Sequence, residues 1–566
     1  MTYKQIKVWF SANTNKSALK QLLALWLFTL LLACGGGGES ETPVLDNQQP
    51  NNPSPAEPMS FNTVLKRSET SNLQVSHGYT EYNDDQGLIA SMAAGVTVGD
   101  YDNDGDLDIF IVRGDIGPDL LFANNGKGQF TDVTQQAGLP YNEMHQHSGP
   151  LFADFNGDGH LDLFVGAING EPVKVYQNDG AGHFTDVTAG SGLAALMASQ
   201  TISAAAGDYD NDGDIDLALS HWGSDLNVQS MSTEYLWQNV SENGAITFQD
   251  ASVEAGLTID LLRSTNGALG TDHDYSFSPA LVDINQDGHA DLLMASDYGG
   301  SQIFLNNTDG TFTDVTDTDV ISDSDDMGSV LADFDNDGDL DWFVSAIYGK
   351  LKNGNHLYQN DSGEFTNVSR TANIMQGGWG WAGCAADFNG DQLLDIFQTN
   401  GSFTIDLFDD GHANDPSVLF VNSPGLTFSE QAANAGVQDF EQGRGVVCAD
   451  INGDNKPDIL LTTKHPTDSV YLYLNQIEHN NWLRVFLRGK GDNTQALGAV
   501  IKVTVDDVTQ TRVVNLASQY VSHAPTAQLF GLGESDRVDS LEVIWPDGTV
   551  QFQYNLTAGE VIIQQP

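Results

Sequence analysis

The chain has 566 residues, of which 78 are acidic and 22 are basic, and its formal net charge is −56 at pH 7. Residues 1–33 contain four lysines and no acidic residue, so the remainder holds 18 basic and 78 acidic residues, a formal charge of −60. Such a chain repels nucleic acids and anionic lipid surfaces, and it attracts divalent cations or cationic partners. We therefore expect no nucleic-acid partner, and membrane contact only through an N-terminal anchor.

The N-terminus has the form of an export signal. A basic start precedes an apolar stretch over residues 22–33, which is too short to span a bilayer. The following Leu31-Leu32-Ala33-Cys34 resembles a bacterial lipoprotein signal. That resemblance implies a signal peptide over residues 1–33, lipidation of Cys34 and, with Gly35 next, an outer-membrane lipoprotein that is periplasmic or surface-exposed. A cleaved secretory peptide with an incidental cysteine is the alternative.

Residues 34–59 are rich in Gly, Pro, Asn and Gln, which predicts a disordered tether. The rest of the chain predicts two folded parts, residues 60–478 and residues 479–566.

One nine-residue phrase, D-x-[DN]-x-[DN]-x-x-x-D, recurs seven times between Asp100 and Asp458, and each copy runs into an apolar stretch. Calcium takes about six to eight oxygen ligands in flexible geometry, so carboxylates at alternate positions of a tight loop converge on one ion. Positions 1, 3, 5 and 9 supply side chains, position 7 supplies its carbonyl, and a glycine at position 6 turns the chain. The stretches that follow have strand character, which places each loop between two β-strands. Asp-Gly-rich turns without an ion are the alternative.

The cofactor expected is therefore Ca²⁺ with a structural role, up to seven ions. The expected ligands are Asp100, Asp102, Asp104, Asp106 and Asp108; Asp154, Asn156, Asp158, His160 and Asp162; Asp208, Asp210, Asp212, Asp214 and Asp216; Asp283, Asn285, Asp287, His289 and Asp291; Asp333, Asp335, Asp337, Asp339 and Asp341; Asp387, Asn389, Asp391 and Asp395; and Asp450, Asn452, Asp454 and Asp458. Asparagine at position 3 removes a charge, which predicts weaker binding at Asp154 and Asp283. Gln392 and Asn455 replace the glycine, and the loop at Asp387 is the first candidate for an empty site.

Two further phrases repeat between the loops. One is a strand that ends in asparagine, at Asn124, Asn178, Asn239, Asn306, Asn360, Asn422 and Asn475. The other follows in most units, as in Phe130-Thr-Asp-Val-Thr134. Four strands per unit and seven units predict an all-β fold, a seven-bladed β-propeller with calcium loops. The last unit lacks its final strand, so we expect residues 61–82 to supply it and close the ring. A linear solenoid, with exposed edges, is the alternative.

The chain at this point resembles the FG-GAP/VCBS repeat family, whose propellers carry calcium between the first two strands of a blade. Asn481-Trp-Leu-Arg-Val, Phe530-Gly-Leu-Gly533 and Trp545-Pro-Asp-Gly548 resemble the ASPIC/UnbV domain found with such repeats. The family's Ser-Gly-Tyr stretch is Ser518-Gln-Tyr520 here. Alternating apolar stretches and Gly/Asp turns predict a small β-sandwich over residues 479–566.

Cys384 and Cys448 lie three and two residues before their loops, so on alternating strands they are expected to point to opposite faces. We predict buried free thiols, with a disulfide as the less favoured alternative.

The loops opposite the calcium loops gather histidines, aromatic residues and charges. They include Arg113-Gly-Asp115, His145, Asp274, Asp297, His412, Lys464 and His465, and the residues taken as ligand-binding candidates are His147, His221, Trp222, His273, Tyr298, Trp379, Trp381 and Arg444. Core-facing tryptophans and scattered loop residues are the alternative. The Arg-Gly-Asp tripeptide is a weak adhesion signal, and a metal site at His145 and His147 has no visible third ligand.

These patterns favour a non-enzymatic, calcium-binding surface lipoprotein that binds an extracellular protein or glycan. The alternative is a calcium-dependent polysaccharide lyase or hydrolase with its active site opposite the calcium loops, which requires an acid/base pair near the axis. No P-loop, nucleophile elbow or zinc-hydrolase motif occurs in the sequence. Catalytic residues and oligomeric state are not predicted.

Overall fold

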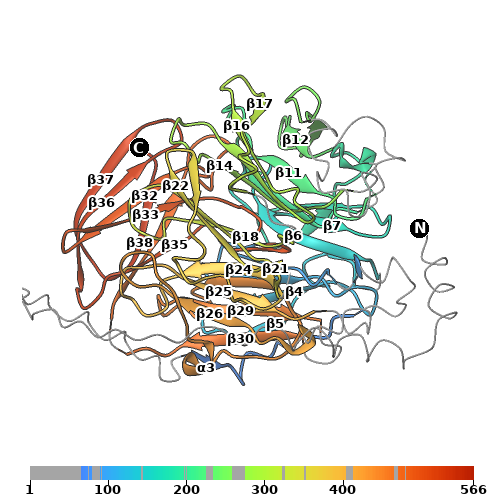
Figure 1. The fold of residues 1–566 in the computed structure, drawn as a ribbon. Helices are drawn as coiled ribbons and strands as arrows, with labels where there is room; N and C mark the ends of the chain where they lie inside the picture. Colours follow the sequence, from blue (N-terminus) through green and yellow to red (C-terminus); the bar gives the residue numbers. More distant parts are fainter. Residues whose placement is uncertain are drawn as a thin grey trace, which may run out of the picture. The chain divides into compact units, whose positions relative to one another are not determined.

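The computed structural model describes residues 65–566 except 74, 79–88, 91, 142–143, 197, 199, 225–233, 258–273, 322–324, 350–351, 403–411, 465–468 and 479 (Figure 1). The predicted signal peptide, Cys34 and the tether lie outside the described residues. None of the helices in the described ranges has the length and apolar character needed to cross a membrane.

Up to residue 475, the described strands form seven sheets with the same order of strands. Sheet 1 contains β2 (Val96–Gly99), β3 (Asp108–Ile111), β4 (Leu120–Asn124) and β5 (Phe130–Asp132); sheet 2 contains β6 (His147–Ala153), β7 (Asp162–Ala167), β8 (Lys174–Asn178) and β9 (Phe184–Asp186); sheet 3 contains β10 (Ser203–Gly207), β11 (Asp216–Ser220), β12 (Leu236–Asn239) and β13 (Phe248–Asp250); sheet 4 contains β14 (Ser276–Val282), β15 (Asp291–Ser296), β16 (Gln302–Asn306) and β17 (Phe312–Asp314).

Sheet 5 contains β18 (Ser329–Ala332), β19 (Asp341–Val344), β22 (His356–Asp361) and β23 (Glu364–Asn367), with a hairpin of β20 (Tyr348–Gly349) and β21 (Lys352–Asn353) beside them; sheet 6 contains β24 (Gly380–Ala386), β25 (Asp395–Asn400), β26 (Val418–Val421) and β27 (Ser429–Glu430); sheet 7 contains β28 (Gly443–Ala449), β29 (Asp458–Thr463), β30 (Val470–Asn475) and β1 (Leu65–Arg67). The short helix α3 (Ala432–Ala435) follows β27.

The N-terminal strand completes sheet 7. β1 pairs antiparallel with β30, and Leu65 lies opposite Asn475. The prediction that residues 61–82 supply the missing outer strand is therefore confirmed. A strand from the start of the chain thus protects the edge that β30 would otherwise expose.

The first strands of the sheets follow one another around a closed ring. β2 contacts β6, β6 contacts β10, β10 contacts β14, β18 contacts β24, β24 contacts β28, and β28 contacts β2 again. Between β14 and β18, the hydroxyl of Ser278 donates to the carbonyl of Met327 at 2.7 Å. The return from β28 to β2 is absent in a linear solenoid, so that alternative does not apply. The prediction of an all-β, propeller-like fold is confirmed.

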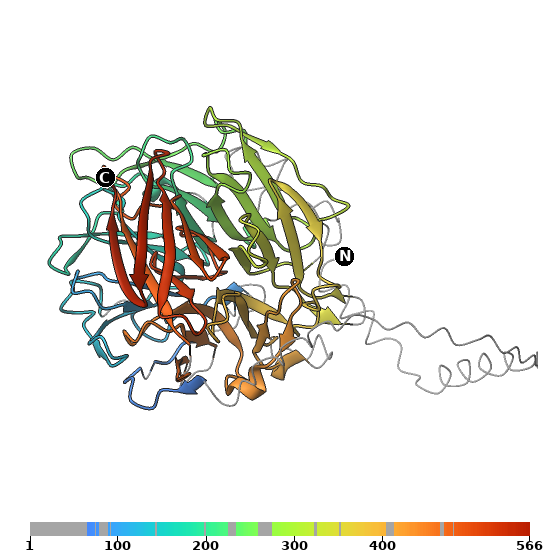
Figure 2. The ribbon, with the colours of Figure 1, turned by 90° about the vertical axis from the view of Figure 1, so that its left-hand side faces the viewer.

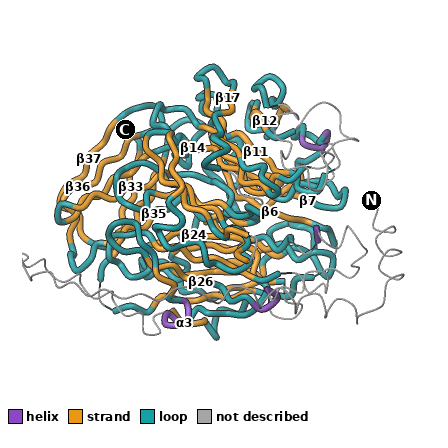
Figure 3. The backbone as a smooth tube through the Cα atoms, viewed as in Figure 1, coloured by secondary structure: helices purple, strands orange, loops and turns teal. Residues whose placement is uncertain are grey.

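A C-terminal region, residues 482–566, follows the ring and has two sheets (Figure 2, red). One contains β31 (Trp482–Arg488), β35 (Gln528–Gly531) and β38 (Gly559–Gln564); the other contains β32 (Val500–Val505), β33 (Val508–Val513), β36 (Arg537–Ile544) and β37 (Val550–Thr557). Buried apolar residues of both sheets, such as Val485 and Leu541, belong to one core with residues of sheets 2 and 3. Strands and loops dominate the described chain, and helical turns are few and short (Figure 3).

The C-terminal region reaches the centre of the ring through one extended stretch, residues 515–524, which we call the central segment. Its strand β34 (Ser522–His523) pairs parallel with β2. The hydroxyl of Ser518 lies beside Ser203 of β10, and its N–H donates to the carbonyl of Pro279 in β14 at 3.0 Å. The hydroxyl of Ser522 donates to the carbonyl of Val446 in β28 at 2.9 Å.

Two further side chains of the central segment extend this set of contacts. The ring nitrogens of His523 lie 2.8 Å and 2.6 Å from the carbonyls of Pro150 in β6 and Ala204 in β10. The buried ring of Tyr520 lies 5.3 Å from that of Trp381 in β24. Contacts with the first strands of six sheets place the central segment at the middle of the ring, where it holds the C-terminal region to the propeller.

The cysteine prediction is wrong. Cys384 of β24 and Cys448 of β28 form a disulfide with a Cα–Cα distance of 5.8 Å. Alternation along the strands would separate the two side chains only if both cysteines belonged to one sheet. They lie instead in neighbouring sheets of the ring, where opposite faces of the two sheets meet, so side chains on opposite faces point toward each other.

Candidate metal centres

All seven acidic loops have the same place in their sheets. Position 1 directly follows the first strand, and position 9 is the first residue of the second strand, as Asp100 and Asp108 show. The residue before position 1 pairs with position 9 in each sheet, for example Gly99 with Asp108. The predicted placement of the loops between two strands is confirmed.

Position 6 needs a left-handed backbone, which glycine adopts without a steric penalty. Gly105 has φ of 94°. Gln392 and Asn455 adopt the same region, with φ of 77° and 66°. The two loops without glycine therefore keep the path of the others, with backbone strain that glycine avoids.

The carboxylate at position 9 is held by backbone N–H groups. The oxygens of Asp108 accept from Tyr101 at 3.3 Å and from Asn124 at 2.8 Å. The same pair of bonds occurs at Asp162, Asp216, Asp291, Asp341, Asp395 and Asp458. Position 9 thus serves the fold with or without an ion, so its presence alone does not separate a calcium loop from a turn.

The asparagine that ends each third strand connects neighbouring loops. The side-chain amide of Asn178 donates to the carbonyl of Leu161 in its own loop and to that of Tyr101 in the preceding loop, at 3.0 and 2.7 Å. Asn124 does the same with Leu107 and with Ile451 of sheet 7, which closes the circle. Equivalent bonds to the preceding loop come from Asn239, Asn306, Asn360, Asn422 and Asn475.

Sequence reasoning recorded these asparagines only as strand ends. Their recurrence at one position of every unit was the available signal. Their partners in the preceding unit lie 76 to 97 residues earlier in the chain, and the partner of Asn124 lies 327 residues later, so the spacing alone did not reveal them.

Position 1 divides the loops into two classes. In the loops with aspartate at position 3, which we call Asp-type loops, one oxygen of position 1 is buried without a hydrogen-bond partner among the described residues. These oxygens are Asp100 Oδ1, Asp208 Oδ1 and Asp333 Oδ2. Their second oxygen accepts one backbone N–H, such as that of Gly213 for Asp208 at 3.0 Å.

The Asn-type loops, with asparagine at position 3, satisfy position 1 internally. Asp283 accepts from the N–H groups of Asp287 and Gly288, at 3.2 and 2.8 Å, with one oxygen each. The loops at Asp154, Asp387 and Asp450 repeat this pattern. In addition, the amide of Asn285 donates to Asp287 at 3.0 Å, and Asn156 and Asn389 bond in the same way. A position-3 amide therefore replaces a carboxylate and forms a bond inside the loop.

Carboxylates crowd together in the Asp-type loops. Oxygens of Asp100, Asp102 and Asp108 lie within 4.8 Å of one another, as do those of Asp208, Asp210 and Asp216 and of Asp333, Asp335 and Asp337. Burial raises the pKa of Asp108 to about 8, and nearby carboxylates add to the rise. The same causes raise the pKa of Asp208 to about 7. Converging hard oxygens, buried and short of a partner, fit a calcium ion.

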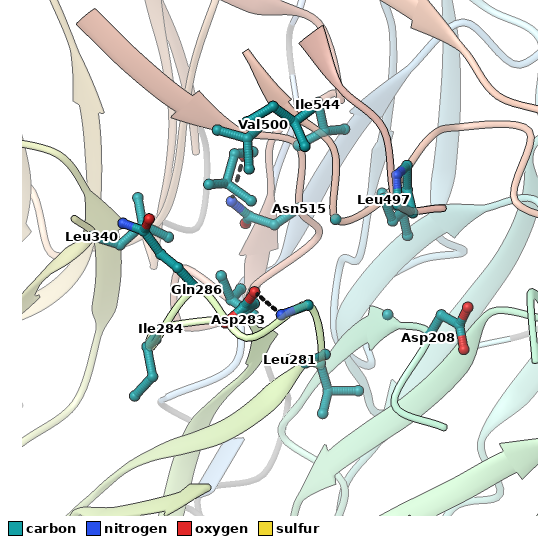
Figure 4. Close-up of a pocket in the computed structure, with 18 of the residues that line it drawn as sticks. Asp208, Leu281, Asp283, Ile284, Gln286, Leu340, Leu497, Val500, Asn515 and Ile544 are labelled. Atoms are coloured by element: carbon teal, nitrogen blue, oxygen red, sulfur yellow. Dashed lines mark hydrogen bonds between the residues drawn. The ribbon is translucent and has the colours of Figure 1, made fainter. Parts of the chain in front are cut away.

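The C-terminal region covers the side of the ring that carries the loops. The hydroxyl of Thr494 donates to Asp154 at 2.5 Å, and the indole N–H of Trp482 donates to the carbonyl of Asp387 at 3.1 Å. A cavity of about 250 Å³ remains between the two parts. Figure 4 shows Asp208 and Asp283 on the propeller side of this cavity and Val500 on the side of the C-terminal region.

The ligand-binding candidates on the other side of the ring are largely buried. Trp222 packs against Phe277 with ring centroids 5.4 Å apart, and the guanidinium of Arg444 lies 4.2 Å above the ring of Trp381. Trp379 contacts His412, and Tyr298 contacts Tyr275. This packing agrees with the alternative interpretation, in which the tryptophans face the core. A role in ligand binding stays a prediction.

The histidine candidates have local partners. His147 lies 2.5 Å from Asp119 and stacks on His145, with ring centroids 4.9 Å apart. The buried His221 faces the carbonyls of Gln200 and Glu234 at 2.8 and 3.1 Å. His273 and His465 lie outside the described residues.

Comparison with known proteins defines the class of this chain. A model of FG-GAP-like repeats matches residues 100–165, 154–219 and 283–344, and a model of the ASPIC and UnbV family matches residues 489–565. The matched segments contain five of the acidic loops and most of the C-terminal region. The protein is thus a propeller-like protein of FG-GAP-like repeats with a C-terminal ASPIC/UnbV domain.

The chain is homologous to cartilage acidic protein 1. It is 24% identical to the Mus musculus protein over 490 residues, which cover 80% of this chain and 70% of that protein. It is 25% identical to the Homo sapiens protein over 507 residues, which cover 82% and 70%. The FG-GAP and ASPIC/UnbV resemblance predicted from the repeats is confirmed.

Solved structures resemble the chain more distantly. A lectin from Agrocybe aegerita that recognises non-reducing terminal N-acetylglucosamine is 17% identical, with a TM-score of 0.36 and coverage of 68% of this chain and 94% of that chain. The V. cholerae biofilm matrix protein Bap1 is 11% identical, with a TM-score of 0.34 and coverage of 73% and 91%. Scores this low support no functional inference.

Proposed function

We propose that this protein is a calcium-stabilised, non-enzymatic binding module of the cell envelope. One observation carries the calcium assignment: the Asp-type loops each bury a carboxylate oxygen that no described donor reaches. A buried carboxylate oxygen without a hydrogen-bond donor is costly, and an ion that binds the converging oxygens removes that cost. At Asp333 the charge of Arg512 offsets part of it. Calcium here holds the first two strands of a blade together and takes part in no reaction.

The partner is proposed to bind on the side of the ring away from the acidic loops. The C-terminal region contacts the loop side through Thr494, Trp482 and Arg484, which leaves less of that side for another molecule. The loops on the other side supply the histidines, tryptophans and tyrosines named above. An extracellular protein or a glycan is the proposed partner, and it would meet the loops of this side and the half-buried His145 and Tyr298 rather than the buried tryptophans.

The proposed location is the outer membrane, with attachment through lipidated Cys34. Extracellular fluids and the periplasm reach calcium concentrations at which even weak extracellular-type sites fill, with Kd of about 10⁻⁴ to 10⁻³ M. Metabolic labelling with a palmitate analogue tests this assignment. Incorporation that disappears in Cys34→Ser supports it, and unlabelled wild-type protein contradicts it.

A calcium-dependent polysaccharide lyase or hydrolase is the second candidate. Asp297 and Asp325 form a bridge between neighbouring sheets, and burial together with the carboxylate of Asp325 raises the pKa of Asp297 well above its usual range. Two neighbouring carboxyl groups in different environments are an arrangement that glycan hydrolysis uses. The homology to cartilage acidic protein 1 favours binding over catalysis.

Two assays test the proposal. Calorimetric titration and thermal melting with and without chelator should show several bound calcium ions and a large rise in Tm. Purified glycans incubated with the protein should bind without the release of shortened or unsaturated sugars. Sugar release that disappears in Asp297→Asn would replace the binding proposal by the enzymatic one, whereas calcium-independent melting would remove the calcium assignment.

A further inference from the structure

The loop at Asp450 has a close ion pair at its first position, which no other acidic loop shows among the described residues. The guanidinium of Arg484, from β31 of the C-terminal region, lies 2.8 Å from Asp450 Oδ2. The exposed fraction is 10% for the arginine side chain and 0% for the aspartate side chain. Arg484 also pairs with Glu560 of β38. A cation from a distant part of the chain is therefore buried against the first position of this loop.

A second cation lies inside the same loop. Lys456 occupies position 7, where the other loops have Asp, His or Leu, and its ammonium lies 3.6 Å from Asp454 at position 5. The loop holds three aspartates, Asp450, Asp454 and Asp458, against two paired cations. The loop at Asp100 holds five aspartates in the same nine positions, and Arg484 acts on it only at longer range, through the attraction between its charge and Asp106.

The carboxylate oxygens at positions 1 and 9 of the loop at Asp450 all accept hydrogen bonds, although the side-chain oxygen of Asn455 at position 6 is buried without a partner among the described residues. Asp450 accepts the N–H groups of Asp454 and Asn455 at 2.9 and 2.8 Å, in addition to the bond from Arg484. The two oxygens of Asp458 accept the N–H groups of Asn475 and Ile451. The loop therefore attracts a cation less strongly: Arg484 and Lys456 offset most of the charge of its three aspartates, and Asp450 already accepts two backbone N–H groups.

We propose that Arg484 and Lys456 replace calcium at the loop at Asp450, so that this loop closes sheet 7 without an ion. Calcium affinity depends on the number of ligand charges, and a guanidinium that pairs with a buried carboxylate supplies the same compensation with fixed geometry. The inference rests on the proposed function, because it divides the loops of a calcium-binding protein into those that take the ion and one that does not.

Arg512 of β33 extends the arrangement at longer range. Its guanidinium is buried, and burial lowers its pKa. The nearby carboxylates of Asp333 and Asp387 act in the opposite direction, and the net pKa is about 10. The C-terminal region therefore supplies two buried arginines to the sheets 5 to 7 side of the ring. The attraction between these arginines and the carboxylates of the loops also helps to hold the C-terminal region on the side of the ring that carries the loops.

Calorimetric counting of calcium ions on the full chain tests the proposal. In the wild-type background, Asp450→Asn should leave the number of bound ions unchanged, whereas Asp100→Asn should lower it by about one. The double variant Arg484→Gln/Lys456→Gln should bind about one additional ion, and adding Asp450→Asn to that double variant should remove the gain. The matched control Arg488→Gln/Lys490→Gln removes the same charges at exposed positions of the same region and should bind the wild-type number.

The outcomes separate the two proposals. If wild-type protein binds no calcium, the proposed function fails. If it binds calcium but Asp450→Asn lowers the count, or the double variant gains no ion while its control is also unchanged, only the replacement by Arg484 and Lys456 is wrong. Should the double variant fail to fold, the comparison of Asp450→Asn with Asp100→Asn still decides the question in the wild-type background.

Discussion

The Asp-type and Asn-type loops have the same backbone path and different ways of holding it. At Asp208, one oxygen of position 1 is left for an ion. At Asp283, one sheet further along, both oxygens accept backbone N–H groups. Loops with aspartate at position 3 leave one oxygen of position 1 without a hydrogen bond. Loops with asparagine at position 3 satisfy both oxygens of position 1 with their own backbone N–H groups.

Sheets 6 and 7 carry this contrast furthest. Their loops, at Asp387 and Asp450, lack the glycine at position 6, and the disulfide between Cys384 and Cys448 joins their first strands. Contacts from Trp482 and Arg484 reach the same two loops. The two loops without glycine are thus held by a disulfide between their strands and by contacts from the C-terminal region, which also reaches the loop at Asp154.

Calcium removal should have the largest effect. Each site that is saturated at 100 times its Kd stabilises the folded state by about 2.7 kcal/mol, so loss of three Asp-type sites should lower the free energy of unfolding by several kcal/mol. Differential scanning calorimetry with and without chelator measures the change. Equal Tm values in the two conditions would contradict the role assigned to the Asp-type loops.

Loss of the disulfide should come next. The cysteines are 64 residues apart, and chain entropy predicts a stabilisation of about 4 kcal/mol for a loop of this length. Cys384→Ala with Cys448→Ala should lower the free energy of unfolding by a similar amount in calcium and in chelator, since the bond joins the sheets with Asn-type loops. Denaturant unfolding of the oxidised protein and the variant checks this, and an effect confined to one calcium condition would be unexpected.

Asn306→Ala should destabilise both kinds of loop at once. Its amide donates to the carbonyl of Tyr209 in an Asp-type loop and to that of Ala290 in an Asn-type loop. Two buried carbonyls then lose their donor, for a combined loss of about 3 kcal/mol. Urea unfolding measures it, with the exposed Asn307→Ala as the neighbouring control; a calcium-loaded variant as stable as wild type would show that the ring of asparagines is dispensable.

A matched pair of substitutions at position 1 separates the two classes. Asp208→Asn should reduce the calcium-dependent gain in stability by about 2.7 kcal/mol, because a ligand of an ion is lost. In chelator it should leave stability unchanged or higher, since one of several crowded charges is gone. Asp283→Asn should instead destabilise the protein in chelator, because an amide N–H then faces a backbone donor. Parallel melting curves of the two variants give the comparison, and identical behaviour would remove it.

Exchange at position 3 should have the smallest effect. Asp102→Asn should weaken calcium binding at its loop about tenfold, or about 1.4 kcal/mol, and Asn156→Asp should strengthen binding at the loop at Asp154 by a similar factor, because the number of ligand charges sets the affinity. Calorimetric titration resolves shifts of this size. Affinities that move in the opposite direction would show that the amide is the better ligand.

Most of the fold could be predicted from the sequence, because local chemistry and spacing repeat. The phrase from Asp100 to Asp108 places a turn between two strands, and the strands that end at Asn124 and Asn178 recur at matching distances. The last unit lacks its final strand, and an unpaired edge is unfavourable, so the sequence indicated that an N-terminal segment supplies β1.

The parts that were not predicted depend on residues far apart in the chain. Cys384 and Cys448 meet because two sheets face each other, which alternation within one strand does not show. The pairing of Arg484 with Asp450, and the contact of Tyr520 with the middle of the ring, require the position of the C-terminal region. The sequence identified the acidic loops, but the division of these loops by the bonds at position 1 appears only when their backbone is in place.

The most direct test of this division is anomalous diffraction near the calcium edge from crystals equilibrated at low calcium. The account predicts strong anomalous peaks in the loops at Asp100, Asp208 and Asp333, weaker ones at Asp154 and Asp283, and none beside Arg484 in the loop at Asp450. Equal peaks in all seven loops, or empty Asp-type loops beside filled Asn-type loops, would contradict it.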